Sequence, residues 1–401
     1  MECKVINQVL LLVLILLEFF GLLIISSPSF DYLFALIIII TAIPSFMVEG
    51  TYARMIRWYF LFFLLSCFYS WKFNGQSLPG VIVHAYDYFA ILFFFFLVRT
   101  DLSSSDTVKV IEKVALCFCC CYILQWIVFP TILFTGASDD ININANQYRA
   151  RMPGSMTSYF LLIYSVNRYL IEKKYVFILY AILAFIPILI MGFRSLTALS
   201  ILAIFIMIPF VLRSTKRTIL FGIIGAGALY VALSTGLAQS KIEEMMERQE
   251  SDQTFENEDY IRFLSLNYYW NEQFDKPYEK IIGGGVPVDW DSRYFKTIDA
   301  EKEQDGFYWD DLGLIGLGLV IGFPATILLI LLYVVCMWKC REPDIQYVRF
   351  TLFVVLIGSI FTSRELYREG NILLFSLFLY LEYKYHAEQS EQSSLPVQNG
   401  E

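Results

Sequence analysis

The sequence predicts an all-α polytopic membrane protein. Of its 401 residues, 57% are hydrophobic and only 17% are charged, and the mean hydropathy is +0.57. Soluble domains are about 45–50% apolar and about 25% charged. Apolar runs such as VLLLVLILLEFFGLLII at 9–25 recur along the chain. Some are long enough to cross a bilayer, which takes roughly 20 residues. We therefore expect about twelve transmembrane helices.

The predicted spans form two groups on either side of one long polar segment. Residues 1–237 hold nine of them, with an outer loop at 131–155; they run over 5–25, 31–48, 55–71, 81–98, 110–130, 156–171, 175–192, 195–212 and 218–237. Residues 312–387 hold three more, at 312–337, 348–362 and 370–385. Several runs are short or carry a polar break, so one or two are candidates for re-entrant segments. The polar stretch 388–401 predicts a disordered cytoplasmic tail.

Basic residues predict the orientation of these spans. With the N-terminus in the cytoplasm, pairs such as Lys173–Lys174 and Arg54–Arg57 fall in cytoplasmic loops, whereas the opposite short loops are nearly free of positive charge. This asymmetry follows the positive-inside rule and places both termini inside. The segment 238–311 then faces outward as a loop with short helices, one of them expected over 259–275 and ended by Pro277.

Several functional classes find little support. None of the eight cysteines falls in the two outer loops, so we expect no disulfide framework there. The run CFCCC at 117–121 is interpreted as small packing residues, and the only histidines, His84 and His386, are far apart. We expect no metal, no cofactor and no nucleic-acid partner. The chain has no GxxxxGK[ST] or GxGxxG motif, which argues against a nucleotide-driven pump.

A set of outer arginines breaks the positive-inside pattern. Arg194, between two apolar spans, is the most unusual of them, because an arginine at that depth costs several kcal/mol unless it is paired or hydrated. The alternative is that each arginine reaches lipid phosphates or pairs with a local acid such as Glu365 or Glu369. The set comprises Arg149, Arg151, Arg194, Arg262, Arg293, Arg364 and Arg368.

Guanidinium groups gathered at one face predict an anionic ligand. Arginine is always charged and binds paired oxygens with two parallel hydrogen bonds, so it suits a phosphate or a diphosphate. A departing diphosphate gains charge that such groups stabilise without a metal ion. A catalyst also needs a base for the attacking hydroxyl, and DGFYWDDLGLIGLGL at 305–319 offers Asp305, Asp310 and Asp311. The alternative for these acids is a helix N-terminus favoured by its dipole.

Three motifs carry a resemblance to a known family. Arg262 is followed by aromatic residues, KP and IIGGG; Asp305 opens D-G-x-Y before a glycine-spaced span; and GFRSLTALSIL at 192–202 places Arg194 at the start of another. Together with the long outer loop, this order resembles the bacterial O-antigen polymerase and ligase superfamily. The resemblance implies a GT-C-type glycosyltransferase of the bacterial inner membrane. Such an enzyme works at the periplasmic face on glycans carried by undecaprenyl diphosphate.

The resemblance also implies roles for individual residues. Arg194 and Arg262 would hold the diphosphate and, with Asp305 as base, form the catalytic set; Arg149, Arg151, Arg364 and Arg368 would add diphosphate contacts. Where the ligase branch has a histidine, this chain has Asp305, which favours a polymerase. The expected partners are the lipid-linked oligosaccharide, membrane lipid and a chain-length regulator protein. A ligase, a protein-modifying O-oligosaccharyltransferase, and a lipid-linked oligosaccharide flippase or other transporter are the alternatives.

The aromatic residues beside Arg262 have two interpretations. Tyr268, Tyr269, Trp270 and Tyr308 would contact sugars, or they anchor the loop at the membrane interface, where Tyr and Trp gather. The stretch IIGGGVP would let the chain double back close to the membrane, because glycine adopts backbone geometries that other residues avoid. We interpret these glycines as structural rather than phosphate-binding.

Overall fold

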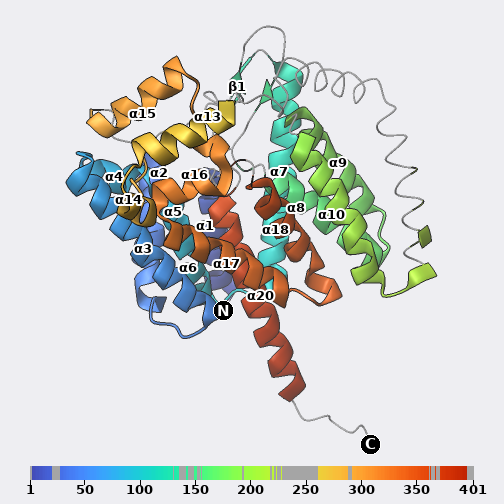
Figure 1. Cartoon of the computed structure of the whole chain (residues 1–401). Helices are drawn as coiled ribbons and strands as arrows, with labels where there is room; N and C mark the ends of the chain where they lie inside the picture. The colour runs from blue at the N-terminus through green and yellow to red at the C-terminus, as the bar shows by residue number, and fades with distance from the viewer. Residues whose placement is uncertain are drawn as a thin grey trace, which may run out of the picture.

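The computed structural model describes most of the chain as helix (Figure 1). The described residues are 2–19, 28–129, 131–134, 141–142, 149–150, 154, 156–191, 194–216, 219–220, 223, 227, 261–287, 291–360, 362, 366 and 371–394. Among them, the strands β1 (Ile141–Asn142) and β2 (Arg149–Ala150) form one short antiparallel ladder. The predicted all-α class is confirmed.

The helices follow in chain order, with 3-10 and π segments labelled η. The first part of the chain holds α1 (Glu2–Phe19), α2 (Pro28–Ala42), η1 (Ile43–Ser45), α3 (Thr51–Phe73), α4 (Leu78–His84), α5 (Tyr86–Phe89), η2 (Ala90–Leu92), α6 (Phe93–Thr100), α7 (Ser104–Val128), α8 (Met156–Glu172), α9 (Val176–Met191) and α10 (Arg194–Leu212). The second part holds α13 (Ile261–Asn267), η4 (Tyr268–Gln273), α14 (Pro277–Ile282), α15 (Arg293–Gln304), η5 (Trp309–Leu312), α16 (Gly313–Ile321), α17 (Phe323–Lys339), η6 (Pro343–Ile345), α18 (Gln346–Gly358) and α20 (Asn371–Ser394).

Within the described residues, two helices are long and apolar enough to cross a membrane, Ser104–Val128 and Ser195–Leu212. Shorter apolar helices run over Ile6–Leu17, Tyr32–Ser45, Val176–Met191 and Phe323–Lys339. Among the predicted spans that the structure describes, some are divided between separate helices. The span at 81–98 is divided among α4, α5, η2 and α6, and the span at 312–337 is divided into α16 and α17. Most of the predicted span 218–237 lies outside the described residues.

The C-terminal helix α20 lies in the centre of the core. Its residues from Asn371 to Leu381 are all buried, and it packs against η2, α6, α7, α8 and α17. The hydroxyl of Ser376 donates to the carbonyl of Ala90 at 3.1 Å, within the break between α5 and α6. The last helix of the chain therefore satisfies a backbone group that the broken segment exposes.

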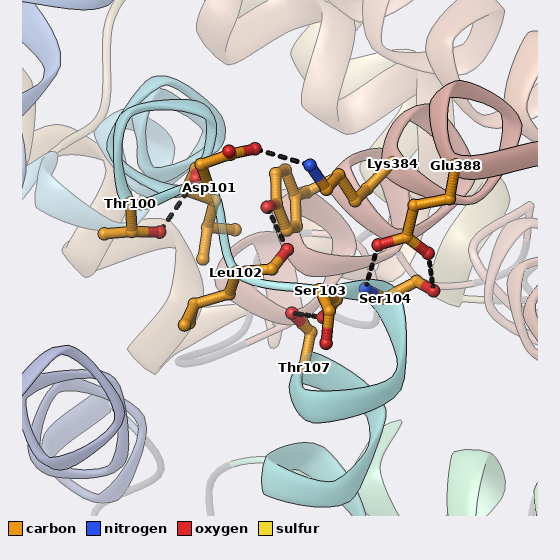
Figure 2. A network of polar contacts seen from close by, with 10 residues as sticks. Thr100, Asp101, Leu102, Ser103, Ser104, Thr107, Lys384 and Glu388 are labelled. Atoms are coloured by element: carbon orange, nitrogen blue, oxygen red, sulfur yellow. Dashed lines mark hydrogen bonds and ion pairs between the residues drawn. The ribbon is translucent and has the colours of Figure 1, made fainter. Parts of the chain in front are cut away.

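The end of α20 corrects the predicted tail. Residues 388–394 continue the helix instead of being disordered, and residues 395–401 lie outside the described residues. Figure 2 shows why this extension is ordered. The carboxylate of Glu388 accepts the backbone N–H of Ser104 at 3.0 Å and its hydroxyl at 2.5 Å, and Lys384 pairs with Asp101 at 2.5 Å. An acid at the start of α7 is also favoured by the helix dipole.

Candidate functional site

The segments from α13 to η5 form a small helical unit at the end of the molecule away from the C-terminal end of α20 (Figure 1). We call it the cap and define it as residues 261–287 and 291–312. It has a core of its own, in which side chains of the cap pack against Leu319 of α16: Tyr269, Phe274, Tyr294 and Ile298. This core joins η4 to α15 and holds both against α16.

The three consecutive glycines, Gly283–Gly285, form the seam between the cap and the helix bundle. The N–H of Gly284 donates to the carbonyl of Leu319 at 2.9 Å, and the N–H of Gly285 donates to that of Val320 at 2.8 Å. Both carbonyls belong to the last turn of α16, just before the break at Gly322, so the seam satisfies groups that the broken helix leaves open.

Each glycine of the seam is required by close approach. A Cβ on Gly284 would lie 2.6 Å from the hydroxyl oxygen of Tyr294, and one on Gly285 would overlap the side chain of Ser70. The φ angles of Gly283 and Gly285, +87° and +85°, are also unfavourable for other residues. Every described contact of these glycines is structural, in agreement with the sequence interpretation.

The end of α3 and the turn after it hold the seam from the other side. The side-chain amide of Asn74 donates to the carbonyl of Gly284 at 2.7 Å, and that of Gln76 donates to Val286 at 2.8 Å. Nothing in the stretch WKFNGQSLPG indicates this role in advance, because its partners are distant in the chain. These positioning residues were missed by sequence reasoning.

A buried carboxylate joins α14 to α3. Glu279 accepts a hydrogen bond from the hydroxyl of Tyr69 at 2.6 Å and pairs with Lys276 at 3.1 Å. The hydrogen bond to Glu279, together with its charge, raises the pKa of Lys276. The Tyr69 hydroxyl and the Lys276 ammonium together offset the cost of burying the negative charge of Glu279.

Two of the three predicted catalytic residues lie on neighbouring segments of the cap. Arg262 is a partly buried residue of α13, and Asp305 is an exposed residue at the end of α15. Two observations show that the segments meet. The hydroxyl of Tyr269 donates to the carbonyl of Phe307 at 3.0 Å, and Gly306 lies so close to Ile261 that an added Cβ would be 3.9 Å from its Cδ1. The chain segments that carry Arg262 and Asp305 therefore lie next to each other in the cap.

The end of α15 is acidic, because Glu301 and Asp305 lie close together there. Partial burial raises the pKa of Glu301, and the charge of Asp305 and a hydrogen bond with it raise the pKa further, as does the more distant Glu272. Glu301 therefore holds a proton more readily than an isolated glutamate does. Glu301 and Asp305 thus form a close pair of carboxylates at the end of α15.

The aromatic residues beside Arg262 divide into two kinds. Tyr269, grouped by sequence with the sugar contacts, is instead a fully buried residue of the cap core, so a direct sugar contact there is not supported. Trp270 and Tyr308 are 38% and 41% exposed. Tyr268 is half-buried, and burial, with Glu301 and Glu272 nearby, raises its pKa to about 12. Its hydroxyl stays protonated near neutral pH and acts as a donor, as it does to Gln273 at 3.2 Å.

Tyr268, Tyr269 and Trp270 lie on a π-helix that the sequence does not predict. Residues Tyr268–Gln273 form η4, inside what the sequence predicts as an ordinary helix over 259–275. Residues 259 and 260 lie outside the described residues. The wider π turn ends with the N–H of Phe274 donating to the carbonyl of Tyr269 at 3.1 Å. Because π turns are rare and are frequent at functional sites, η4 is a further reason to place a site in the cap.

The remaining predicted arginines are described only in part. Arg194 opens α10 and Arg149 lies in β2, but their side chains are outside the described part of the structure, as are all atoms of Arg151, Arg364 and Arg368. Their roles in binding diphosphate stay predictions. Arg293 is an exposed residue at the start of α15 and lines an open cleft of about 480 Å³ with Lys296, Asp291 and Glu301.

No protein-family model matches the chain. No curated protein matches it either.

Proposed function

We propose that the protein is a multi-pass membrane glycosyltransferase that polymerises glycan repeat units carried on undecaprenyl diphosphate. It would work at the periplasmic face of the bacterial inner membrane. The observation that carries the proposal is the contact between the segments that carry Arg262 and Asp305, on a cap that packs onto a bundle of apolar helices. The resemblance to O-antigen polymerases supplies the substrate class.

The outer surface of the helices supports placement in a bilayer. α1 exposes Ile6, Leu10 and Leu14, which lie one helical turn apart on one face. α3 exposes a similar stripe that starts at Trp58 and ends at Trp71. These two tryptophans are about 20 Å apart along the helix axis, so the stripe covers about two thirds of the roughly 30 Å hydrocarbon core of a bilayer. Lipid covers such stripes without the cost that water imposes.

Arg262 has surroundings that suit a lipid-borne anion. Its neighbours Ile261, Phe263 and Leu264 are all exposed apolar residues on the same short helix. A guanidinium among such side chains lies where a diphosphate and its prenyl chain would meet the interface. It binds two phosphate oxygens at once and stabilises the charge that develops as the carrier leaves.

Asp305 would act as general base in this reaction. The hydroxyl of the acceptor glycan attacks the anomeric carbon of the donor glycan while its proton passes to the carboxylate of Asp305. The bond between the anomeric carbon and the diphosphate oxygen breaks, and undecaprenyl diphosphate departs with the bonding electrons. Glu301, beside Asp305, offers a second oxygen pair for the proton. Arg194, Arg149, Arg151, Arg364 and Arg368 are the further candidates for diphosphate binding.

A transporter is the second candidate, because α16 and α17 form a discontinuous helix. Transporters bind substrates or ions at such breaks. Here the carbonyls of Leu319 and Val320 already accept hydrogen bonds from the glycine seam, which favours a structural break. A ligase is less favoured because Asp305 stands where that branch has a histidine.

Substitutions test the proposed chemistry. Arg262→Ala is expected to lower polymerisation about 10²–10³-fold, the usual cost of losing one group that stabilises developing charge. Arg262→Lys should recover part of it, because the charge returns without the two-pronged geometry. Arg293→Ala is the matched control, an outer arginine exposed on α15. Asp305→Asn should cost about 10²–10⁴-fold if this carboxylate is the base.

Glycan chain length on gels, compared at equal amounts of folded protein, is the readout. Equal loss in Arg262→Ala and Arg293→Ala would contradict the diphosphate role of Arg262.

Lipid analysis of a deletion strain separates the classes of function. A missing polymerase leaves single repeat units capped at the cell surface. A missing flippase leaves them on the cytoplasmic leaflet, and a missing ligase leaves long chains on the carrier lipid.

A further inference from the structure

We infer that α14 and Trp270 form a lipid-binding surface that rests in the headgroup region of the outer leaflet and sets the height of the cap above the bilayer. This inference rests on the proposed membrane function and adds a specific contact to it. We call the surface the interfacial face and define it by Trp270, Tyr278, Ile281 and the two lysines Lys276 and Lys280.

The composition of the interfacial face is that of an interfacial helix. Trp270, Tyr278 and Ile281 are 38%, 48% and 58% exposed, whereas Glu279 on the opposite side of α14 is only 8% exposed. Lys280 lies over the ring of Trp270, with its Nζ 4.5 Å from the ring centroid, and Lys276 lies 5.9 Å from that of Tyr278. The face is thus apolar with Lys280 as its basic group, while Glu279 is turned inward and paired with Lys276.

Phospholipid fits this arrangement better than water or another protein. Tyrosine and tryptophan favour the headgroup layer because each has an apolar ring and a polar atom. Lysine side chains extend from an apolar surface to reach phosphates. A helix with aromatic and aliphatic groups on one side and basic groups at its edge lies in the plane of the interface, with its apolar face about 5–10 Å deep.

The interfacial face continues from the end of a helix whose exposed side is apolar. Tyr69 of α3 makes an edge-to-face contact with Tyr278 at 6.1 Å between ring centroids, and its hydroxyl binds Glu279. The neighbouring residues Phe68 and Phe73 of α3 are exposed. If the stripe on α3 faces lipid, then α14, fastened to the end of that helix, lies where the acyl region gives way to headgroups.

The position of α14 controls the geometry of the candidate site. Directly after α14 comes the glycine seam, and shortly before it comes η4, which follows the helix that carries Arg262. A fixed depth for α14 therefore fixes how far Arg262 and Asp305 lie from the diphosphate of a carrier anchored in the same leaflet. The interfacial face is a positioning device for the lipid-linked substrate.

Site-directed labelling tests the inference in the full-length protein. Three single cysteines are introduced at exposed positions, which leaves the core intact: Ile281→Cys on the interfacial face, Leu65→Cys on the α3 stripe, and Lys296→Cys on α15. The protein is reconstituted into vesicles of phosphatidylethanolamine and phosphatidylglycerol. A membrane-impermeant maleimide is then added, and labelling is measured peptide by peptide so that native cysteines do not interfere. Each rate is divided by the rate after denaturation in SDS.

The inference predicts that position 281 labels about tenfold more slowly than position 296, because an interfacial helix buries its apolar face below the headgroups. Position 65 should be protected as well. If 65 is protected and 281 labels as fast as 296, the interfacial face is wrong while the proposed membrane enzyme survives. If 65 also labels as fast as 296, the helix bundle is not in the bilayer and the proposed function itself fails.

Discussion

Gly285→Ala is the sharpest test of the seam between the cap and the bundle. The φ angle of Gly285 is +85°, and a Cβ there would come closer than 3.0 Å to both Cβ and Oγ of Ser70. Its N–H also donates to the carbonyl of Val320 at 2.8 Å. Alanine at this position therefore has an unfavourable φ angle and overlaps Ser70. If residues 283–285 move away to relieve the overlap, the hydrogen bond to Val320 is lost.

These contributions add up to a large effect. The positive φ costs about 1–2 kcal/mol for a residue with a Cβ. Overpacking costs about 1–3 kcal/mol. A displaced backbone hydrogen bond costs about 1 kcal/mol. We expect Gly285→Ala to lower the free energy of unfolding by about 3–6 kcal/mol, the sum of these three contributions. Unfolding of purified protein in detergent, followed by heat or by SDS titration, measures it.

Two companion variants separate the contributions. Gly75→Ala is the matched control, because Gly75 has φ +70° but nothing within 4 Å of an added Cβ, so it should lose only about 1–2 kcal/mol. Ser70→Gly removes both overlapping atoms. In that background, Gly285→Ala should also cost only about 1–2 kcal/mol. The reasoning is refuted if the two glycine variants agree within about 0.5 kcal/mol, or if Ser70→Gly leaves the cost at position 285 unchanged.

Three further substitutions test other contacts. Tyr69→Phe removes the hydroxyl that Glu279 accepts and should cost about 1.5–3 kcal/mol, the range for a hydrogen bond to a charged group; an unchanged Tm would contradict this. Glu388→Gln weakens the charged contact with Ser104 and should cost about 0.3–1 kcal/mol and speed proteolysis of the end of α20; unaltered cleavage would argue against the contact. Glu301 has a pKa raised above its ordinary value of 4.5, so the folded state binds its proton more tightly than the unfolded chain does, and its contribution to stability falls as pH rises through the raised value. Glu301→Gln should therefore be more stable than the parent at pH 7 and lose that advantage below pH 4.5, and a gap independent of pH would count against the raised pKa.

Sequence patterns predicted those features that depend on local composition. The apolar run at 110–130 corresponds to α7, although the helix begins earlier, at Ser104. Its N-cap is Ser103, whose hydroxyl accepts the N–H of Asp106. The three glycines were expected to be structural, because consecutive glycines indicate backbone geometry and close approach. Arg262, Asp305 and the aromatic residues were expected in one outer unit, and the structure places them in the cap.

Features that depend on distant partners were not predictable. Gly322 and Pro324 mark the break between α16 and α17 in the sequence, but the glycine seam that binds the carbonyls before the break comes from another part of the chain and could not be predicted. The helical end of α20 depends on the contacts of Lys384 and Glu388 with the start of α7, whereas its own polar composition indicates disorder. The burial of Tyr269 depends on the π turn, for which no sequence signal is known to us.

The central place of α20 has a consequence for how the protein is made. This helix leaves the ribosome after the segments that it packs against: its residues from Asn371 to Leu381 are buried against segments synthesised much earlier, and Ser376 donates to a carbonyl in the break at Ala90–Leu92. Until α20 is synthesised, those early segments lack its surface to pack against. We expect nascent chains that stop before residue 371 to stay bound to insertion factors or be degraded, so reporter fusions truncated there would misstate the arrangement of the first helices.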